Sequence, residues 1–317
     1  MGTVQHISPA AGLIDLQVNG YGGIDFNDVS LSKKDAETVC ELLYKEDVAG
    51  FLPTLITNSL EVVESLAEII LSADDSNGAK ILGLHLEGPF ISPKEGARGA
   101  HPAQWIRPPD IDFVKRLQDK TNGRIRIVTF SPEWDDNVKG CAVKFTEQLC
   151  SLGIHPAIGH TSASQEQIAE AAAAGADLST HLGNGIQPLL PRHPNPIWSQ
   201  LSEDNLSVSL IGDGFHLPRE VFQTILKLKG KKAFLVSDST KFAGMKAGKY
   251  QTLIGGNVIL TEQGKVHLEE NEHILAGSAM SLKQIIQSLA ARGWMSYSDA
   301  WELGSVRPLE FLNTYAH

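Results

Sequence analysis

The sequence is poor in cysteine. Its three cysteines, Cys40, Cys141 and Cys150, are an odd number without CxxC spacing, and each lies in a stretch with a helical pattern. This excludes a disulfide-stapled scaffold and a cysteine-based zinc module, so we expect reduced thiols.

Long apolar runs and a leader-like start are also missing. No apolar stretch approaches the roughly 18–20 residues that a membrane-spanning helix needs. The first residues, MGTVQHISPAAG, lack a basic segment followed by an apolar one, which is the pattern of a secretory signal. We therefore expect a cytoplasmic protein without a membrane partner.

Positive charge is in short supply as well. Lys and Arg number 27 against 37 Asp and Glu, which gives a formal net charge of −10. Nucleic acids and anionic membranes are bound by clustered Lys and Arg, so we expect no nucleic-acid partner. A small anionic ligand needs only one local cluster, and Arg192 with His193 is a candidate.

What the sequence does contain is an alternation of strand-like apolar runs and helical patterns, typical of repeated βα units with a parallel sheet. Eight such strands predict an α/β protein, a (β/α)8 TIM barrel of the metal-dependent hydrolase type, with its active site at the carboxyl ends of the strands. The expected strands are 13–19, 51–57, 79–88, 124–130, 155–160, 177–182, 206–214 and 232–238. Helices are expected at 33–46, 60–73, 111–119, 136–152, 164–174 and 219–229, and a proline-rich connection at 186–201 follows the sixth strand.

One segment interrupts this alternation. We expect residues 1–317 to form a single barrel domain, within which 243–276 is a β-hairpin insert or small sheet because short β-like runs are separated there by glycines. Helical patterns return at 278–292 and 298–313, with Ser278 and Ser298 as their expected N-caps.

Polar side chains stand where several of the expected strands end. Glu87 ends the apolar run ILGLHLE and is followed by Gly88 and Pro89, which stop a strand. Four more polar residues close or directly follow later strands: His160, His181, His216 and Asp238. Because the carboxyl ends of barrel strands meet at one mouth, these five groups predict one site.

Glu87, His160 and His181 have the composition of a catalytic metal site. Two imidazoles and one carboxylate fill three of four tetrahedral positions and leave one for water, whose pKa a metal lowers to near ~7. Each residue alone is explained as well by a hydrogen-bonded core or surface role; their joint position at strand ends favours a metal. Zinc is expected, although iron, cobalt and nickel accept the same ligands.

Four further residues are candidates for the chemistry. Asp238 has the properties of a catalytic acid/base. The alternative interpretation is a structural one, in which its side chain caps the turn at the following Ser-Thr. His101, in the glycine-rich EGARGAH, either polarises a substrate carbonyl or is an exposed loop residue. Asn184 and Gly185 could bind polar ligand atoms, but a glycine in such a loop also serves a tight turn.

The ordered motifs identify a resemblance. GLIDLQVNGYGGIDFND, GLHLEGPFIS, GARGAH, VTFSPE, IGHTSAS, STHLGNG, GDGFH, LVSD and LAGSAMSL follow one another between Gly12 and Asn313. In this the chain resembles the N-acetylglucosamine-6-phosphate deacetylases of the amidohydrolase superfamily. The resemblance implies hydrolysis of the acetamide to acetate and an amino sugar phosphate, and it implies a homodimer.

The resemblance also implies residue roles. Glu87, His160 and His181 would bind the metal, Asp238 would be the acid/base, and His101 would contact the acetamide. The sugar phosphate would be bound by a further set: Asn184, Gly185, Arg192 and His216.

The chain departs from the family in three places. Pro191 to Pro194 replace the family's Arg-Glu-Pro-Gly turn, and the family's β-sandwich is expected to be mostly missing, with 243–276 as its counterpart. Amidohydrolase barrels commonly begin with two histidines one residue apart, but here the corresponding positions are Asp15 and Gln17. This predicts one tightly held metal, with a second weak or absent. A cyclic amidase or deaminase acting on another small amide, and a non-catalytic metal- or sugar-binding barrel, remain as alternatives.

Overall fold

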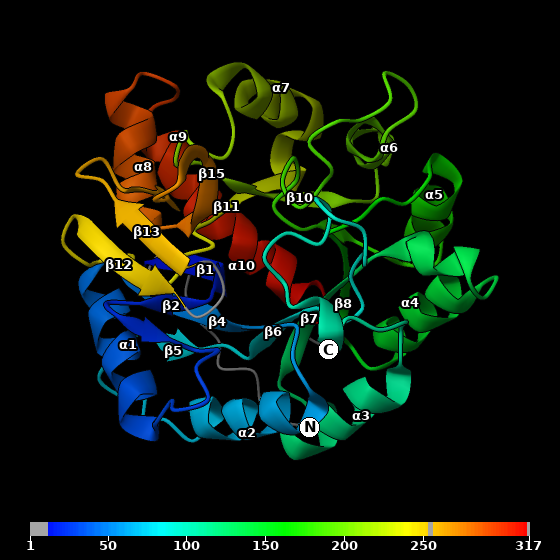
Figure 1. Ribbon diagram of the computed structural model, residues 1–317, viewed down its shortest axis with the longest axis horizontal. Coiled ribbons are helices and arrows are strands. Elements are labelled where there is room, and N and C mark those ends of the chain that lie inside the picture. The colour runs from blue at the N-terminus through cyan, green and yellow to red at the C-terminus, as the bar shows by residue number, and fades with distance from the viewer. Residues whose placement is uncertain (1–11, 253–255, 316–317) are drawn as a thin grey trace.

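The structure is a computed structural model that describes residues 12–252 and 256–315. The start of the chain and residues 253–255, within the expected insert, lie outside the described residues. Eight parallel strands follow one another around a barrel in chain order (Figure 1). They are β1 (Leu13–Val18), β4 (Val48–Ile56), β6 (Leu84–Glu87), β7 (Ile125–Phe130), β8 (His155–Ile158), β9 (Leu178–Ser179), β10 (Ser207–Ile211) and β11 (Ala233–Val236). The predicted (β/α)8 barrel is confirmed.

The barrel is brought close to closure where its first and last strands meet. A parallel bridge joins Val18 to Ser239, and the backbone N–H of Asn19 donates to Ser239 O over 2.8 Å. These contacts place the ends of β1 and β11 side by side at one mouth.

Helices surround the strands; the predicted ones are present, most of them with shifted ends, and one more begins within the proline-rich connection. They are α1 (Lys33–Lys45), α2 (Leu60–Leu71), α3 (Ile111–Lys120), α4 (Cys141–Ser151), α5 (Gln165–Ala173), α6 (Pro196–Ser202), α7 (Arg219–Lys229), α8 (Leu282–Ala291), α9 (Tyr297–Gly304) and α10 (Val306–Leu312). Capping boxes begin α1 at Ser32 and α5 at Ser164. Among the described helices, none is both long enough and apolar enough to cross a bilayer.

Several predicted boundaries were wrong. The third strand is broken at Leu82 and Gly83 into β5 (Lys80–Ile81) and β6; Gly83 has φ +139°, and a Cβ there would lie 2.4 Å from the Arg126 side chain. The helix expected from 136 begins only at Cys141, because residues 132–136 form a 3-10 turn.

The predicted N-caps of the last helices were also wrong. Ser281, not Ser278, caps α8, because Gln284 stands three residues later and completes a capping box. Ser296, not Ser298, caps the next helix. The stretch expected as one helix to residue 313 is divided at Ser305 into α9 and α10.

An apolar cluster fills the end of the barrel opposite the mouth, where α10 closes it. Phe311 and Leu312 pack on inward-facing side chains that include Ile14, Ile127 and Phe234. Each such fully buried side chain contributes about 2 kcal/mol through lost apolar surface. The carboxyl ends of the strands are therefore the open end.

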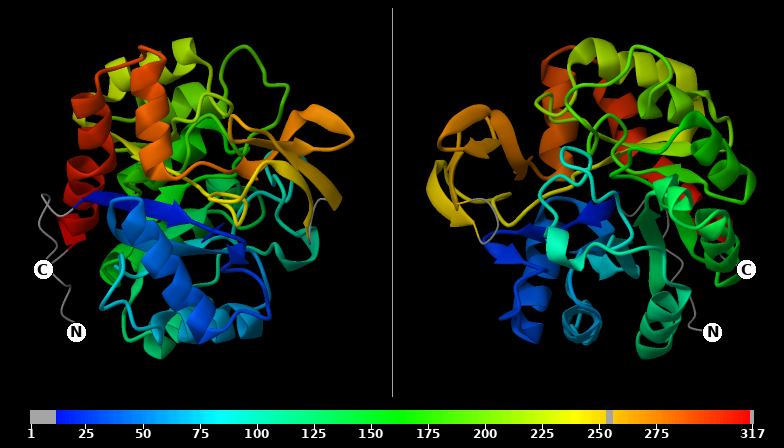
Figure 2. Two further views of the ribbon diagram at one scale, coloured as in Figure 1. Left: turned by 90° about the vertical axis from the view of Figure 1, so that its left-hand side faces the viewer. Right: turned by 45° about the vertical axis from the view of Figure 1, so that its right-hand side comes forward.

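Two antiparallel units are added to the barrel. β2 (Gly20–Tyr21) pairs with β3 (Ile24–Asp25), and a four-stranded sheet stands between β11 and α8. Its strands are β12 (Gly248–Thr252), β13 (Gly256–Leu260), β14 (Lys265–Leu268) and β15 (Asn271–Ser278). Figure 2 shows this sheet projecting from the side of the barrel, and a bridge from Ser239 to Ser278 joins its last strand to the mouth.

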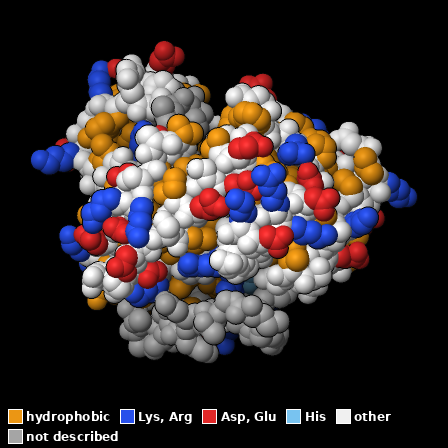
Figure 3. Space-filling view, turned by 90° about the horizontal axis from the view of Figure 1, so that it is seen from below, with side chains coloured by type: hydrophobic (Ala, Val, Ile, Leu, Met, Phe, Trp, Pro, Cys, Tyr) orange, Lys and Arg blue, Asp and Glu red, His pale blue; other side chains and the backbone are white. Residues whose placement is uncertain are grey.

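Charges of both signs are interspersed on the face seen in Figure 3. Ion pairs such as Lys120–Glu68 (2.9 Å) and Arg107–Asp110 (3.0 Å) join exposed side chains, where each contributes little to stability. Cys40 is buried, and Cys141 and Cys150 are partly exposed.

Candidate active site

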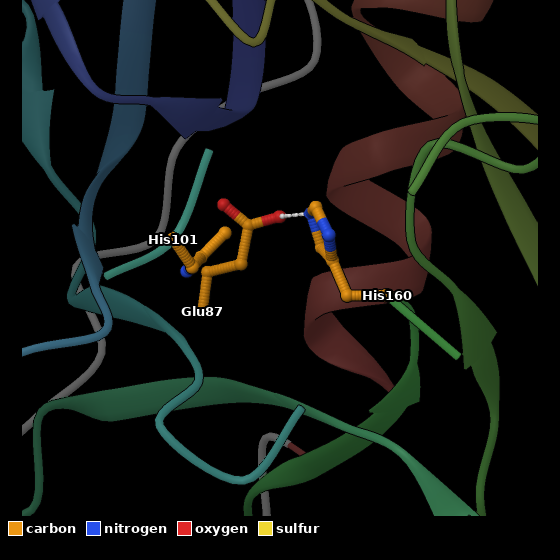
Figure 4. A group of neighbouring side chains, drawn as sticks. All are labelled: Glu87, His101 and His160. Carbon is orange, nitrogen blue, oxygen red and sulfur yellow. Dashed lines mark ion pairs between the residues drawn. The ribbon is translucent and has the colours of Figure 1, made fainter. Parts of the chain in front are cut away.

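Glu87, the last residue of β6, is a buried carboxylate that three nitrogens approach. Its side-chain oxygen Oε1 lies 2.8 Å from His181 Nε2, 3.2 Å from His160 Nε2 and 3.1 Å from Gln17 Nε2. Figure 4 shows the Glu87 carboxylate and the His160 ring pointing toward one another. The structure thus brings together the three residues that the sequence predicted as metal ligands.

The backbone turns the side chains at three strand ends. His160, His181 and Asp238 have positive φ angles of 45°, 30° and 48°. This left-handed region is unfavourable for residues other than glycine and costs on the order of 1–3 kcal/mol at each position. Such strain is found where a site needs a side chain in one direction, and here it follows β8, β9 and β11.

The hydrogen bonds of His160 favour a cation beside Glu87. His160 Nδ1 lies 2.9 Å from the carbonyl oxygen of Ala97, which only accepts, so Nδ1 carries the hydrogen. In a neutral ring Nε2 then has only a lone pair, although it lies 3.2 Å from a carboxylate oxygen. These two electron-rich atoms would repel each other, and a metal cation bound between them removes that repulsion. A ring nitrogen that donates to a backbone carbonyl is also typical of histidine ligands.

His181 adds a second nitrogen to the same position. Its Nε2 faces Glu87, and its Nδ1 is buried without a hydrogen-bond partner among the described residues. The three side chains fit a divalent metal by the chemistry of their donor atoms.

A second set of possible ligands overlaps with the first. One ligand atom each from Glu87, His101 and His160 lie within 4.8 Å of one another. The two sets differ in one histidine, His101 or His181. His181 makes the shorter contact with the Glu87 carboxylate. Whether His101 can be a ligand depends on which of its ring nitrogens carries the hydrogen.

The electrostatics distinguish the two carboxyl groups of the site. Burial raises the pKa of Glu87, but the contacts with His160 and His181 outweigh burial and hold that pKa well below its usual range. Loss of hydration, followed by the nearby charge of Glu87, raises the pKa of Asp238 to about 6. One carboxyl is therefore kept charged, while the other can exchange a proton near neutral pH.

Asp238 is held by a residue that the sequence reasoning passed over. Its Oδ1 accepts a hydrogen bond of 2.7 Å from Asn19 Nδ2. Asp15, which we expected at the site, lies deeper in the barrel, where it accepts from the backbone N–H of Ser237 over 3.0 Å. Gln17 contacts Glu87, and Asn19, which directly follows β1, contacts Asp238. The mouth therefore lies at Gln17 and Asn19, and the expected pair, Asp15 and Gln17, was wrong by one step.

His101 is buried and not an exposed loop residue. Its Nδ1 lies 2.8 Å from Thr57 Oγ1, and its ring stands edge-on to that of His160 with centroids 4.5 Å apart. Arg98 ties the loop by donating to the carbonyl oxygen of His101 over 2.9 Å. Burial, followed by the neighbouring His160, lowers the pKa of His101 to about 3, so the ring is neutral at physiological pH.

Asn184 and Gly185 lie beside the two histidines. Asn184 Nδ2 donates to the carbonyl oxygen of His181 over 3.2 Å. Gly185 has φ +60°, and a Cβ there would lie 2.8 Å from His160 Nδ1, so any side chain would displace the ring. A glycine is required at position 185 both because the His160 ring lies so close and because the backbone has a positive φ there.

His216 is oriented by a partner that the sequence reasoning also missed. Its Nδ1 lies 2.7 Å from Asp213 Oδ2, which the spacing GDGFH alone did not indicate. Burial raises the pKa of Asp213, but the contact with His216 outweighs it and lowers that pKa.

Arg192 lies on the exposed loop between β9 and α6. Its side chain forms no hydrogen bond or ion pair with any residue in the described part of the chain. The neighbouring His193 lines a surface hollow of about 440 Å³ together with Gln165 and Trp198. The structure does not bring Arg192 into contact with Glu87 or its histidines.

Comparison with known proteins places the chain in a family. No protein-family model matches it. The N-acetylglucosamine-6-phosphate deacetylase of Bacillus subtilis (strain 168) is 35% identical over 279 residues, which cover 86% of this chain and 67% of that protein. The chain belongs to the N-acetylglucosamine-6-phosphate deacetylase family. The enzyme of that name from Bos taurus is 30% identical over 313 residues, 96% of this chain and 74% of that protein.

Solved structures of the family have the same fold. An N-acetyl-D-glucosamine-6-phosphate deacetylase mutant from Mycobacterium smegmatis, in complex with N-acetyl-D-glucosamine-6-phosphate, matches with a TM-score of 0.81 at 26% identity, over 96% of this chain and 77% of that one. The N-acetylglucosamine-6-phosphate deacetylase from Thermotoga maritima matches with a TM-score of 0.78 at 28% sequence identity, over 96% of this chain and 78% of that one. The family resemblance and the barrel predicted from the sequence are confirmed.

Proposed function

We propose that this family member hydrolyses the acetamide of N-acetylglucosamine 6-phosphate to acetate and the amino sugar phosphate. The observation that carries the proposal is the convergence of Glu87, His160 and His181 at the barrel mouth, with Asp238 and His101 alongside. Family membership indicates the class of reaction, and the buried side chains at the barrel mouth are the groups that would carry it out.

Glu87, His160 and His181 are the proposed holders of one divalent metal. Zinc suits two imidazoles and a carboxylate, as do iron, cobalt and nickel. A metal bound there supplies a Lewis acid and lowers the pKa of water. Gln17 and Asn19 present neutral amides, which are poor ligands for a second ion.

Asp238 is the proposed acid/base. As a carboxylate it accepts a proton from the attacking water while the new C–O bond forms, and it returns a proton to the amine nitrogen as the C–N bond breaks. Its raised pKa of about 6 suits both steps near neutral pH. Asn19 fixes one carboxylate oxygen and leaves the other available.

His101 is the proposed donor to the acetamide oxygen. A neutral, buried imidazole that donates a hydrogen bond stabilises the negative charge that develops on that oxygen. Its position beside His160 suits this role.

Asn184, Gly185, Arg192 and His216 are the proposed contacts to the sugar phosphate. The guanidinium of Arg192 has no partner among residues 12–252 and 256–315, which suits a phosphate. Asp213 holds His216 in one orientation. A second candidate substrate is the C4 epimer, because the N-acetylgalactosamine-6-phosphate deacetylase of Shewanella sp. (strain ANA-3) is 28% identical over 304 residues.

We further propose that residues 1–317 act as one barrel domain with 243–276 as its β insert, and that the protein works as a cytoplasmic homodimer. Light scattering of the purified protein would give the mass, which the monomer's 34.3 kDa makes easy to distinguish from a dimer.

Acetate release tests the function. The zinc-loaded protein would be assayed with N-acetylglucosamine 6-phosphate, N-acetylgalactosamine 6-phosphate and unphosphorylated N-acetylglucosamine. We expect fastest release from the first and much slower release from the last. Absence of acetate from all three, with stoichiometric zinc bound, would overturn the proposal.

A further inference from the structure

A buried hydroxyl faces the histidine proposed as the carbonyl donor. Thr57 directly follows β4 and is fully buried, and its Oγ1 lies 2.8 Å from His101 Nδ1. Among the described residues, neither of these two atoms has another hydrogen-bond partner. The position of the ring hydrogen on His101 therefore depends on this contact.

The two possible arrangements differ in what they leave unpaired. If the ring donates from Nδ1, the hydroxyl hydrogen of Thr57 is left without an acceptor in the part of the chain that the structure describes. If the hydroxyl donates to Nδ1, only oxygen lone pairs stay unpaired, and buried structures tolerate unpaired lone pairs better than unpaired donors.

Gly88 removes an alternative for the hydroxyl. It packs so closely that a Cβ on Gly88 would lie 2.2 Å from Thr57 Oγ1. That side of the oxygen is occupied by the Cα of Gly88, which offers no acceptor. The hydroxyl hydrogen is thus directed to the ring.

We propose that Thr57 is a positioning residue that holds His101 with its hydrogen on Nε2. The proposal rests on the proposed function in one respect, because the hydrogen on Nε2 is the one that would be donated to the acetamide oxygen of the substrate. The same hydrogen makes Nε2 unavailable as a ligand while Nδ1 is occupied by Thr57. It therefore favours His181 over His101 as the third metal ligand.

The neighbouring His160 shows the opposite arrangement. Its Nδ1 faces the carbonyl of Ala97, which can only accept, so Nδ1 carries a hydrogen, and Nε2 faces Glu87, where the metal is proposed. A hydroxyl and a carbonyl thus set opposite tautomers in two rings whose centroids are 4.5 Å apart. One ring becomes a donor and the other a ligand.

Nitrogen NMR of the zinc-loaded protein tests this directly. With ¹⁵N-labelled histidine, long-range proton correlations show which ring nitrogen carries the hydrogen, and His101→Asn assigns the signals. We expect His101 with hydrogen on Nε2 and a hydrogen-bonded Nδ1, and His160 with hydrogen on Nδ1 as an internal reference. A hydrogen on Nδ1 of His101 would overturn the proposal.

Two matched variants test the role of the hydroxyl. Thr57→Val keeps the shape and removes the donor, so the Nδ1 signal should move toward that of a free ring nitrogen, and kcat should fall about 10- to 100-fold with little change in KM. Thr57→Ser should restore both. An unchanged Nδ1 signal in Thr57→Val contradicts the proposal; absence of acetate release from the wild type would instead overturn the proposed function and leave the NMR test in force.

Discussion

Asn19 donates a 2.7 Å hydrogen bond to Oδ1 of Asp238, across a sequence separation of 219 residues. This bond favours the charged carboxylate and opposes the loss of hydration that raises the pKa of Asp238. It joins the end of the first barrel strand to that of the last.

Replacing Asn19 should change the pH profile of the enzyme. In Asn19→Ala the carboxylate loses a stabilising donor, so its pKa rises above about 6 and the acid limb of kcat moves to higher pH. We expect kcat at pH 7 to fall about 10-fold or more. Initial rates from pH 5 to 9 measure this, with exposed Asn137→Ala as the control; an unmoved acid limb would argue against the bond's role.

Asp238→Asn should separate chemistry from metal binding. The amide keeps the size of the side chain but cannot take a proton, so turnover should fall about 10²- to 10⁴-fold. Metal analysis should still find one ion per chain, because Glu87, His160 and His181 are untouched. Retained activity would remove Asp238 from the acid/base role.

The two candidate ligand sets predict different metal losses. His181→Asn should lower metal stoichiometry well below one, because His181 Nε2 lies 2.8 Å from Glu87 Oε1. His101→Asn should keep the metal and lose turnover. The comparison is made by elemental analysis after dialysis, and metal loss in His101→Asn alone would favour the alternative set.

Acid should destabilise the barrel through His85. This ring is buried between Leu16 O (3.1 Å) and Thr129 Oγ1 (2.7 Å), and burial lowers its pKa from 6.5 to about 4. Below pH 6.5 the unfolded chain takes up a proton that the folded ring resists, so this stability is lost as pH falls toward 4. Between pH 7.5 and 5 the loss is about 2 kcal/mol.

Urea unfolding of metal-free protein at several pH values measures this loss, since it removes the metal's own pH dependence. His85→Gln should flatten the curve over that range even though it lowers stability overall. A variant curve parallel to that of the wild type would assign the pH dependence to other groups.

Glu133 should stabilise the loops that follow β6, β7 and β8. Its buried carboxylate accepts from Ser92 Oγ (2.9 Å), Ser131 Oγ (3.1 Å) and the backbone N–H of Ser162 (2.6 Å). Glu133→Gln presents a donor where acceptors are needed, and we expect a loss of about 2 kcal/mol. Thermal unfolding measures it, with exposed Glu147→Gln as the control, and equal melting temperatures would contradict the expectation.

Much of the fold was predictable because the signals are local. Apolar runs bounded by turn residues locate all eight strands, and α7 has the predicted bounds, 219–229. Helix ends were less predictable: Ser278, Ser281, Ser296 and Ser298 are all plausible caps, and the choice depends on side chains three residues later and on where the chain leaves the sheet.

By itself, the sequence determined the barrel and the strand-end position of Glu87, His160, His181 and Asp238, because strand periodicity and the shared direction of parallel strands are properties of the chain's own pattern. Only the tertiary structure decided the partners. The stagger of the strands puts Asn19, not Asp15, level with Asp238. Folding brings Thr57 to His101 across 44 residues, and which nitrogen of a histidine carries its hydrogen depends on the atom that faces it in space.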